Sequence, residues 1–292
     1  MEMCILASGS AGNCTIVRCP TGVMLIDVGI GPRVTAKRMG GTGVCTADVK
    51  AICLTHLDRD HFCGNWLASI VRHGIAVYCH CQRVDELMAI AEVRERTASE
   101  RHPFSARQFA QLLHTFDGRR FEPLEGLRVQ PITLAHDTLG SHGFLMEGFG
   151  CRLGYATDLG HVPADLIERF EAVDILALES NYDPEMELRS ARPCFLKQRI
   201  MSGSGHLSNS QALDAVRRIL RRRERKGLPP PEHIVLLHRS RECNCPKLLR
   251  KLFSQDERIG PRLTLAEQYQ PSEWIRPRHV RPASGEQLAM FG

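Results

Sequence analysis

Short, mainly apolar runs that each stop at a polar side chain recur along the chain. They cover residues 23–26, 51–54, 152–157, 173–178 and 234–237, and the polar residues that follow are Asp27, Thr55 with His56, Asp158, Glu179 and His238. Runs of about four to eight apolar residues bounded in this way are typical of buried strands. We therefore predict that each run is a buried strand that delivers a polar residue at its end.

A helical pattern precedes the last of these strands. Between residues 209 and 226 an apolar stripe recurs at helical spacing, and Gly227 provides a stop; the stripe consists of Ala212, Leu213, Val216, Ile219 and Leu220. Strands and helices share one chain without an internal repeat, which predicts the α/β class. We expect one domain over residues 1–275 and a flexible tail over 276–292, because residues 276–286 are rich in Arg, Pro, Ser and Gly.

Length and composition restrict the class of protein further. With 292 residues, of which 43% are hydrophobic, the chain can bury a large core, and this excludes a disordered or fibrous protein. No basic segment followed by an apolar stretch opens the chain, and no apolar run reaches the roughly 20 residues of a membrane span. We expect a cytoplasmic protein without a membrane partner. The net charge of +5 permits an anionic partner without requiring one.

Twelve cysteines are spread through the chain. Without an export signal, reduced thiols are expected rather than disulfides. The segments Cys79-His80-Cys81 and Cys243-Asn244-Cys245 suggest a zinc site, but their Cys-x-Cys spacing differs from that of zinc ribbons. Buried or incidental thiols are the favoured interpretation.

The segment Thr55-His56-Leu57-Asp58-Arg59-Asp60-His61 places four potential metal ligands directly after a predicted strand. Burying two imidazoles and two carboxylates together is costly unless a cation compensates their desolvation. A metal site is therefore the favoured interpretation, and a solvated polar loop is the alternative.

This segment resembles the His-x-His-x-Asp-His signature of the metallo-β-lactamase superfamily. The later strand-end residues His136, Asp158 and His238 follow in the order of that superfamily. The resemblance implies an αββα four-layer sandwich with the site at the edge between two sheets. Fold alone does not determine the chemistry.

Four further segments are similar to those of the YycJ/WalJ-like proteins. They are residues 6–15 (LASGSAGNCT), 179–183 (ESNYD), 205–209 (GHLSN) and 237–240 (LHRS). The similarity extends from residue 3 to about residue 250. Members of that family are regarded as 5′-to-3′ DNA exonucleases linked to mismatch repair and replication, and the resemblance implies the same activity here.

The resemblance also implies a set of metal ligands, carried over position by position. His56, Asp58 and His136 would hold a first divalent cation, Asp60, His61 and His238 a second, and Asp158 would bridge them. Two cations about 3.5 to 4 Å apart lower the pKa of a bridging water, which attacks phosphorus while the ions stabilise the developing charge. Asp60 would orient this water and accept its proton.

Asp58 departs from the family, which carries His at this position. A carboxylate oxygen shifts the preference toward harder ions such as Mn²⁺, Mg²⁺ or Fe²⁺ and away from strictly zinc chemistry. The diiron flavoproteins of the superfamily carry Glu at the matching place, so a carboxylate is compatible with metal binding. The expected cofactors are two divalent ions, Mn²⁺, Zn²⁺ or Fe²⁺.

Other site residues are predicted around these ligands. Asp27 either steadies a ligand imidazole or caps its strand. His206 precedes a predicted helix, where it and backbone amides would grip a phosphate; Ser208 and Asn209 beside it are more simply explained as helix caps. Asn181 and Ser240 are candidates by resemblance only.

Two basic regions are candidate DNA contacts. The first region is the end of the predicted helix over residues 209–226, which carries Arg217, Arg218, Arg221, Arg222, Arg223, Arg225 and Lys226. The second is the tail, which carries Arg276, Arg278 and Arg281. Phosphate binding and a solvated face that complements the helix dipole both stay open.

The last residues resemble the Gln-Leu-x-Leu-Phe peptide by which bacterial repair and replication proteins dock on the sliding clamp. Gln287, Leu288 and Phe291 match it, and Met290 replaces a Leu of similar size. Clamp docking is the favoured interpretation, since it would concentrate the protein at replicating DNA. The alternative is a tail that packs on its own domain.

Three other functions are compatible with the residues. One is a different hydrolase on the same fold, such as a ribonuclease, a cyclic phosphodiesterase or a thioester hydrolase. Another is a catalytically weak, clamp-binding regulatory module. The third, diiron oxygen chemistry, is suggested by Asp58 alone.

Overall fold

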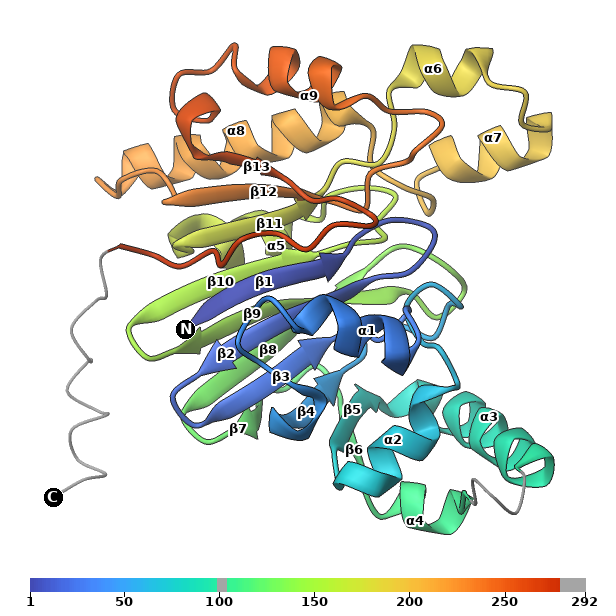
Figure 1. Ribbon diagram of the computed structural model, residues 1–292. Coiled ribbons are helices and arrows are strands. Elements are labelled where there is room, and N and C mark those ends of the chain that lie inside the picture. The colour runs from blue at the N-terminus through green and yellow to red at the C-terminus, as the bar shows by residue number, and fades with distance from the viewer. Residues whose placement is uncertain (99–103, 279–292) are drawn as a thin grey trace, which may run out of the picture.

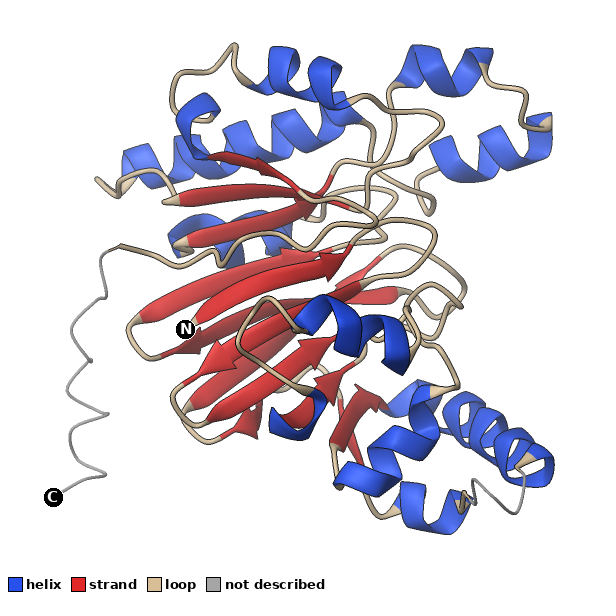
Figure 2. Cartoon of the chain, viewed as in Figure 1, coloured by secondary structure: helices blue, strands red, loops and turns tan. Residues whose placement is uncertain are grey.

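Two β-sheets pack face to face between outer layers of helices, as Figures 1 and 2 show. This computed structural model describes residues 1–98 and 104–278. One sheet has six strands in the order β1-β2-β3-β4-β5-β6, and the other has seven in the order β13-β12-β11-β10-β9-β8-β7. The predicted α/β sandwich of four layers is confirmed.

The first sheet is built from the N-terminal part of the chain. Its strands are β1 (Glu2–Ala7), β2 (Cys14–Cys19), β3 (Gly22–Ile26), β4 (Val49–Cys53), β5 (Ala76–His80) and β6 (Leu113–Phe116). The pairs from β1 to β3 are antiparallel, and those from β3 to β6 are parallel. The α-helices of this half are α1 (Pro32–Met39), α2 (Trp66–His73), α3 (Val84–Thr97) and α4 (Ala106–Ala110).

The second sheet follows in sequence. Its strands are β7 (Phe121–Leu124), β8 (Leu127–Leu134), β9 (Ser141–Gly148), β10 (Cys151–Ala156), β11 (Ile175–Glu179), β12 (His233–Leu237) and β13 (Leu263–Leu265). Strands β7 to β10 pair antiparallel, whereas β10, β11, β12 and β13 run parallel. The α-helices of this half are α5 (Ala164–Arg169), α6 (Pro184–Arg189), α7 (Cys194–Met201), α8 (Asn209–Arg225) and α9 (Pro246–Phe253).

The apolar strands are buried on both faces. In β3, Met24 and Ile26 belong to the core between the sheets, while Val23 and Leu25 belong to the core under the helices. Side chains alternate between the faces of a strand. A strand covered on both sides therefore carries an unbroken apolar run, as is usual for parallel sheets between helices.

The predicted elements lie where the sequence placed them, within one or two residues. The five predicted strands correspond to β3, β4, β10, β11 and β12, and the predicted helix to α8. Strand β11 begins at Ile175 rather than at Val173, because the amide of Val173 closes the preceding 3₁₀ turn on the Phe170 carbonyl.

The last described residues return to the first sheet. The amide of Met3 donates to the carbonyl of Ile275 at 2.9 Å, and the amide of Ile275 donates back to Met3 at 2.8 Å. The clamp-like peptide that contains Gln287 and Phe291 lies outside the described residues, as does Arg281. Among the helices of the described ranges, none is both long enough and apolar enough to cross a membrane.

Candidate metal centre

The polar residues at the strand ends gather at one edge of the two sheets. Asp27 follows β3, Asp158 follows β10 and His238 follows β12, and their φ angles are 58°, 56° and 51°. This left-handed region is uncommon for residues other than glycine and is found often at functional sites. From these positions the carboxylate of Asp27 reaches Nδ1 of His61, and Oδ1 of Asp158 lies 3.5 Å from Nδ1 of His238.

All seven predicted ligands converge there. One group joins His56, Asp58 and His136, and a second joins Asp60, His61 and His238; the ligand atoms within each group lie within 4.8 Å of one another. Asp158 lies between the groups. Its Oδ2 is 2.9 Å from Nε2 of His61 in the second group, and its Oδ1 is 4.0 Å from Nε2 of His136 in the first.

Asp58 takes its place in the first group although it is not the family's histidine. Its Oδ2 lies 3.6 Å from Nε2 of His136 and 3.8 Å from Nε2 of His56. The hydrogen bond to His136 lowers the pKa of Asp58 to about 2. An ionised carboxylate thus occupies the position where the sequence predicts a ligand.

The four histidines of the two groups share one orientation. Each engages Nδ1 with the surrounding protein: His56 with Thr55 Oγ1 at 3.0 Å, His61 with Asp27 Oδ2 at 2.7 Å, His136 with the Gly205 carbonyl at 3.2 Å, and His238 with Glu179 Oε1 at 3.0 Å. Each Nε2 atom faces a predicted carboxylate ligand: those of His56 and His136 face Asp58, that of His61 faces Asp158, and that of His238 faces Asp60. Histidines that bind metals are held in this way, with the second nitrogen hydrogen-bonded to a carboxylate or carbonyl.

Two buried atoms indicate what the centre would bind. Within the described residues, the buried Nε2 of His56 has no hydrogen-bond partner, and the buried Oδ2 of Asp158 faces Nε2 of His61 at 2.9 Å, itself a predicted ligand atom. An unsatisfied buried polar atom is costly. A divalent cation would give Nε2 of His56 a partner and compensate the charge of Asp158, and the nitrogen and oxygen donors of the centre suit Zn²⁺, Mn²⁺ or Fe²⁺.

The pKa values of the histidines in the centre depend on the carboxylates that surround them. Burial disfavours the charged imidazole, but the carboxylates of Asp158 and Asp27 outweigh this and raise the pKa of His61 well above its usual value. The same balance, with Asp158 as the main carboxylate, raises the pKa of His238 to about 10. For His56, burial and the charge of His61 lower the pKa well below normal, so His56 is neutral.

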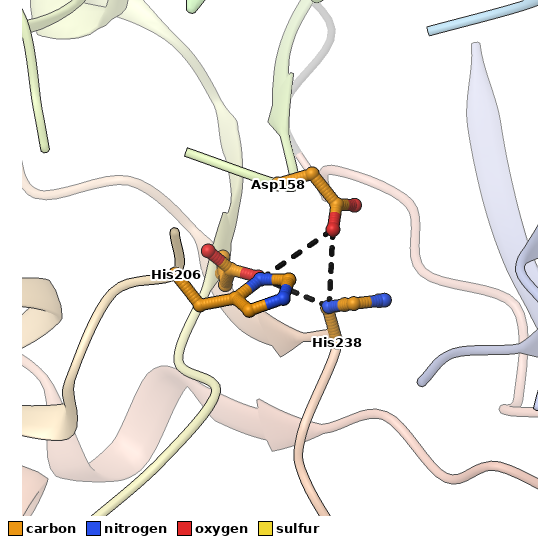
Figure 3. A group of neighbouring side chains, drawn as sticks. Asp158, His206 and His238 are labelled. Atoms are coloured by element: carbon orange, nitrogen blue, oxygen red, sulfur yellow. Dashed lines mark hydrogen bonds and ion pairs between the residues drawn. The ribbon is translucent and has the colours of Figure 1, made fainter. Parts of the chain in front are cut away.

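Glu179 is a central residue of the site that the sequence marked only as a strand end. Its Oε1 lies 2.9 Å from Nδ1 of His206 and 3.0 Å from Nδ1 of His238, and its Oε2 accepts the amides of Leu207 and Leu159. Burial acts to raise the pKa of Glu179, but the charge of His206 and these bonds lower it to about 2. Figure 3 shows Asp158, His206 and His238 turned toward one another.

Asp158, Glu179, His206 and His238 could themselves be taken for a metal site, since their ligand atoms also lie close together. Both histidines, however, present Nδ1 to Glu179 at hydrogen-bond distance. An N–H that donates to a carboxylate is not free to ligate. We therefore interpret this group as support for the centre. The side chain of His206 is 20% exposed, more than those of the four inward-facing histidines.

Backbone contacts fix the loop that carries four of the ligands. The Asp60 carbonyl accepts the amide of Asn13 at 2.6 Å, and a Cβ at Gly29 would lie 1.7 Å from the same oxygen. Only glycine fits there, so Gly29 lets the ligand loop pack against the end of β3. Neither Asn13 nor Gly29 was predicted as a site residue, although Asn13 lies in one of the family-like segments.

The weaker candidates differ in their positions. Asn181 donates Nδ2 to the carbonyl of His238 at 2.7 Å and so holds the chain at that residue. The hydroxyl of Ser240 is engaged away from the predicted ligands: it accepts the amide of Cys243 at 3.1 Å and Nη2 of Arg192 at 3.4 Å. Ser208 caps α8 through the amide of Gln211, as expected.

Asn209 was also expected to cap the helix, and this was wrong. It is buried as the first residue of α8, and its Oδ1 accepts bonds from Ser180 and Asn244. The two Cys-x-Cys segments contribute to none of the groups able to hold a metal within the described residues.

Much of the basic end of α8 is paired with acidic residues of its own domain. Arg222 and Lys226 both contact Glu171, and Arg217 lies 3.5 Å from Asp256. Arg223 is buried and donates to the carbonyl of Val173. These four cations therefore have structural partners.

Comparisons with known proteins agree with this geometry. Residues 24–238 match the family described as the beta-lactamase superfamily domain. The chain is 25% identical over 244 residues to a Streptococcus pneumoniae protein named exodeoxyribonuclease WalJ, covering 84% of this chain and 83% of the relative. It is also 25% identical over 256 residues to exodeoxyribonuclease YycJ of Bacillus anthracis, covering 87% and 88%.

Solved structures share the fold. Human tRNase Z, short form, aligns with a TM-score of 0.62 at 18% identity and covers 94% of this chain and 99% of its own. Zn²⁺-bound PqqB from Methylobacterium extorquens aligns with a TM-score of 0.61 at 16% identity, covering 94% and 100%. At these identities the likeness shows the fold and no more.

Proposed function

The chain belongs to the beta-lactamase superfamily domain family and is a metal-dependent hydrolase, and we propose that its substrate is the phosphodiester backbone of DNA. In this proposal it is a 5′-to-3′ exonuclease that acts in repair, such as mismatch repair, or in replication. The observation that carries it is the convergence of seven ligand side chains at one edge of the sheets, where the buried Nε2 of His56 has no hydrogen-bond partner among the described residues. The choice of DNA is supported by the relatives named exodeoxyribonuclease, which align over more than four fifths of the chain.

The ligands divide into two sets in this proposal. His56, Asp58 and His136 would hold one divalent cation, Asp60, His61 and His238 the other, and Asp158, whose two oxygens face the two sets, would bridge them. The carboxylate of Asp58 favours Mn²⁺ or Fe²⁺ over Zn²⁺ at the first position.

Two cations bound there would lower the pKa of a water molecule and stabilise the negative charge that develops on the phosphate. Asp60 would orient this water and accept its proton, since its Oδ2 lies 3.3 Å from His238 Nε2 and its side chain is 25% exposed. His206 would contact the phosphate or the departing oxygen from the accessible side. Asp27 and Glu179 would hold the imidazoles of His61 and His238 in place.

The test is nuclease activity after removal and controlled return of the metal. Metal-depleted protein is given Mn²⁺, Mg²⁺, Zn²⁺ or Fe²⁺ and assayed on end-labelled double-stranded DNA and on RNA of the same sequence. Stepwise release of nucleotides from 5′ ends of DNA, abolished by Asp60→Asn, is the expected result. Cleavage of RNA alone would point to a ribonuclease. Bound metal without cleavage of either polymer would contradict the proposal and favour a small-molecule hydrolase or a regulatory module.

The C-terminal peptide stays a prediction, because Gln287, Leu288, Met290 and Phe291 lie outside the described residues. We include in the proposal that residues 1–275 form the hydrolase domain and that the remaining residues carry a sliding-clamp ligand. Binding of the full-length chain to a purified bacterial clamp, compared with a Leu288→Ala/Phe291→Ala variant, tests this. Equal binding of both proteins would contradict it.

A further inference from the structure

A groove runs along the outer surface of the second half of the molecule, between α8 and the segment that contains α5. It consists of two adjoining cavities of about 380 and 210 Å³ that share Arg218. The first is lined mainly by residues 161–162 and the start of α8, and the second by Ala164, Ile167 and the basic end of α8. Figure 1 shows α5 and α8 on the same side of the second sheet.

The groove begins at the wall of the metal centre. His161 lies three residues after Asp158, and its Nδ1 is 2.8 Å from the carbonyl of Gly203 in the loop that leads to His206. Leu207, directly after His206, lines the same cavity. The groove and the centre therefore adjoin along two short stretches of the chain, from Asp158 to His161 and from His206 to Leu207.

Four arginines and one carboxylate line the groove, which gives it a net positive charge; they are Arg218, Arg221, Arg222 and Arg225, and Asp214. Arg218, Arg221 and Arg225 are spaced three and four residues apart, and such positions share one face of a helix. Arg221 has a distant acidic neighbour, Asp214, at 3.8 Å. In contrast to Arg222 and Lys226, neither Arg218 nor Arg225 makes an ion pair within residues 1–98 and 104–278.

The length of the groove suits a strand of nucleic acid. From Gln211 to Arg225 the helix rises about 21 Å, at about 1.5 Å per residue. Stacked nucleotides are spaced about 3.4 Å apart along one strand, so about six would lie along this stretch. The floor includes Val162, Ile167 and Ala215, whose apolar side chains offer contacts to bases and sugars between the phosphates.

We infer that this groove holds the part of the DNA strand that has not yet been degraded, with Arg218, Arg221 and Arg225 on successive phosphates. The inference rests on the proposed function. An exonuclease that releases one nucleotide at a time leaves the rest of its substrate on one side of the scissile bond. It therefore needs a single track away from the centre, and this groove begins beside Leu207, the residue after His206.

The experiment compares a long and a short substrate, because a defect in the groove should affect only the long one, whereas a defect in the metal centre should affect both. The variant is Arg218→Ala/Arg225→Ala, and the matched control is Arg107→Ala/Arg128→Ala, which removes the same charge from exposed positions on α4 and β8. The full-length, metal-loaded proteins are assayed for kcat/KM on a 12-nucleotide single DNA strand and on bis(p-nitrophenyl) phosphate. Salt is varied between about 50 and 200 mM, the range over which phosphate contacts weaken markedly.

We expect kcat/KM on the DNA strand to fall about tenfold in the variant at low salt and to stay near wild type in the control. Each lost phosphate contact should reduce the slope of log kcat/KM against log salt by about 0.7, so the variant should lose about 1.4. Hydrolysis of the small diester should be unchanged. Arg218→Lys/Arg225→Lys keeps the charge and should keep most of the slope.

Three results would overturn the track. Unchanged kinetics on DNA would show that the arginines do not contact the strand, and an equal loss on the small diester would show that they support the centre instead. A loss confined to an RNA strand of the same sequence would assign the groove to RNA. If the wild-type protein hydrolyses the small diester but no DNA, the proposed function itself fails, whatever the variant does.

Discussion

The carboxylate of Asp27 lies 2.7 Å from Nδ1 of His61, and both side chains are wholly buried. The carboxylate also accepts the amide of Thr55 at 2.8 Å and the Thr55 hydroxyl. Asp27 therefore fixes the direction in which Nε2 of His61 points and, through Thr55, the start of the ligand loop. It does so from the end of β3, a strand that carries none of the predicted ligands.

Replacement of Asp27 should weaken metal binding without removing a ligand. In Asp27→Asn, the amide keeps one acceptor but cannot serve both His61 and Thr55, and we expect about 10- to 100-fold lower affinity at the position that His61 serves. Competition with a fluorescent chelator measures this. Asp48→Asn, whose carboxylate accepts the Cys45 amide away from the centre, is the matched control. Unchanged affinity in Asp27→Asn would mean that Asp27 only caps its strand.

Glu179→Gln should affect stability and activity together. The glutamate accepts four bonds, so a glutamine would turn its amide hydrogens toward donors such as the Leu207 amide or His206 Nδ1. A buried donor left without an acceptor costs about 1–3 kcal/mol. We expect a lower free energy of unfolding by about this amount, measured in urea, and a loss of hydrolysis below the unfolding transition.

Glu187→Gln separates the two effects, because Glu187 is equally buried but pairs with Arg192 on the α6 side of the molecule. It should lose stability while it retains activity at a temperature where it is folded. Full activity in Glu179→Gln would remove Glu179 from the functional site.

His206→Ala should lower kcat with little effect on metal content. His206 turns Nδ1 to Glu179, and its side chain is the most accessible of the five histidines around the centre. Removal of a positioned acid–base group typically costs about 10²–10⁴-fold in rate. Metal analysis of the same preparation provides the check: a parallel loss of one metal equivalent would make His206 a ligand instead.

The sequence predicts those parts of the site whose evidence is local. The density of His and Asp in residues 55–61 is visible in the sequence, and so are the polar residues that end each apolar strand. The α/β class follows from the same runs together with the helical pattern, whereas the four-layer sandwich was implied by the resemblance to the metallo-β-lactamase superfamily.

Contacts between distant segments could not be predicted in this way. His136 and Gly205 are 69 residues apart in the sequence. Only the folded chain shows that the Gly205 carbonyl lies at hydrogen-bond distance from the His136 ring. Glu179 is one strand-end carboxylate among several, and nothing near it in sequence indicates that two histidines converge on it. The basic end of α8 is similar: Glu171 and Asp256, which pair with Arg222 and Arg217, come from other elements.

Asp58→His should change the metal preference of the centre. The substitution supplies the imidazole that the related family carries and removes an oxygen ligand, which favours Zn²⁺ relative to Mn²⁺. We expect the ratio of bound Zn²⁺ to Mn²⁺ to rise about tenfold or more after equilibration with equal concentrations of both ions. Asp85→His, on the exposed first turn of α3, is the control. An unchanged ratio would show that residue 58 does not ligate.

His142 makes the stability of the fold depend on pH in a way that does not involve the predicted ligands. Its ring is buried, stacks on His80 at 4.3 Å, and has no hydrogen-bond partner at Nδ1 among the described residues. Burial, with the charge of His80, lowers the pKa of His142 to about 4 from the usual 6.5. Between pH 6.5 and pH 4, His142 is protonated in the unfolded chain but neutral in the folded protein. The free energy of unfolding is therefore unaffected by His142 above pH 6.5. It falls by about 3 kcal/mol as the pH decreases from 6.5 toward 4.

Urea unfolding of metal-free protein at several pH values tests this. His142→Phe should not lose this stability, while His114→Phe, at an exposed position on β6, should follow wild type. Parallel curves for wild type and His142→Phe would contradict the assignment.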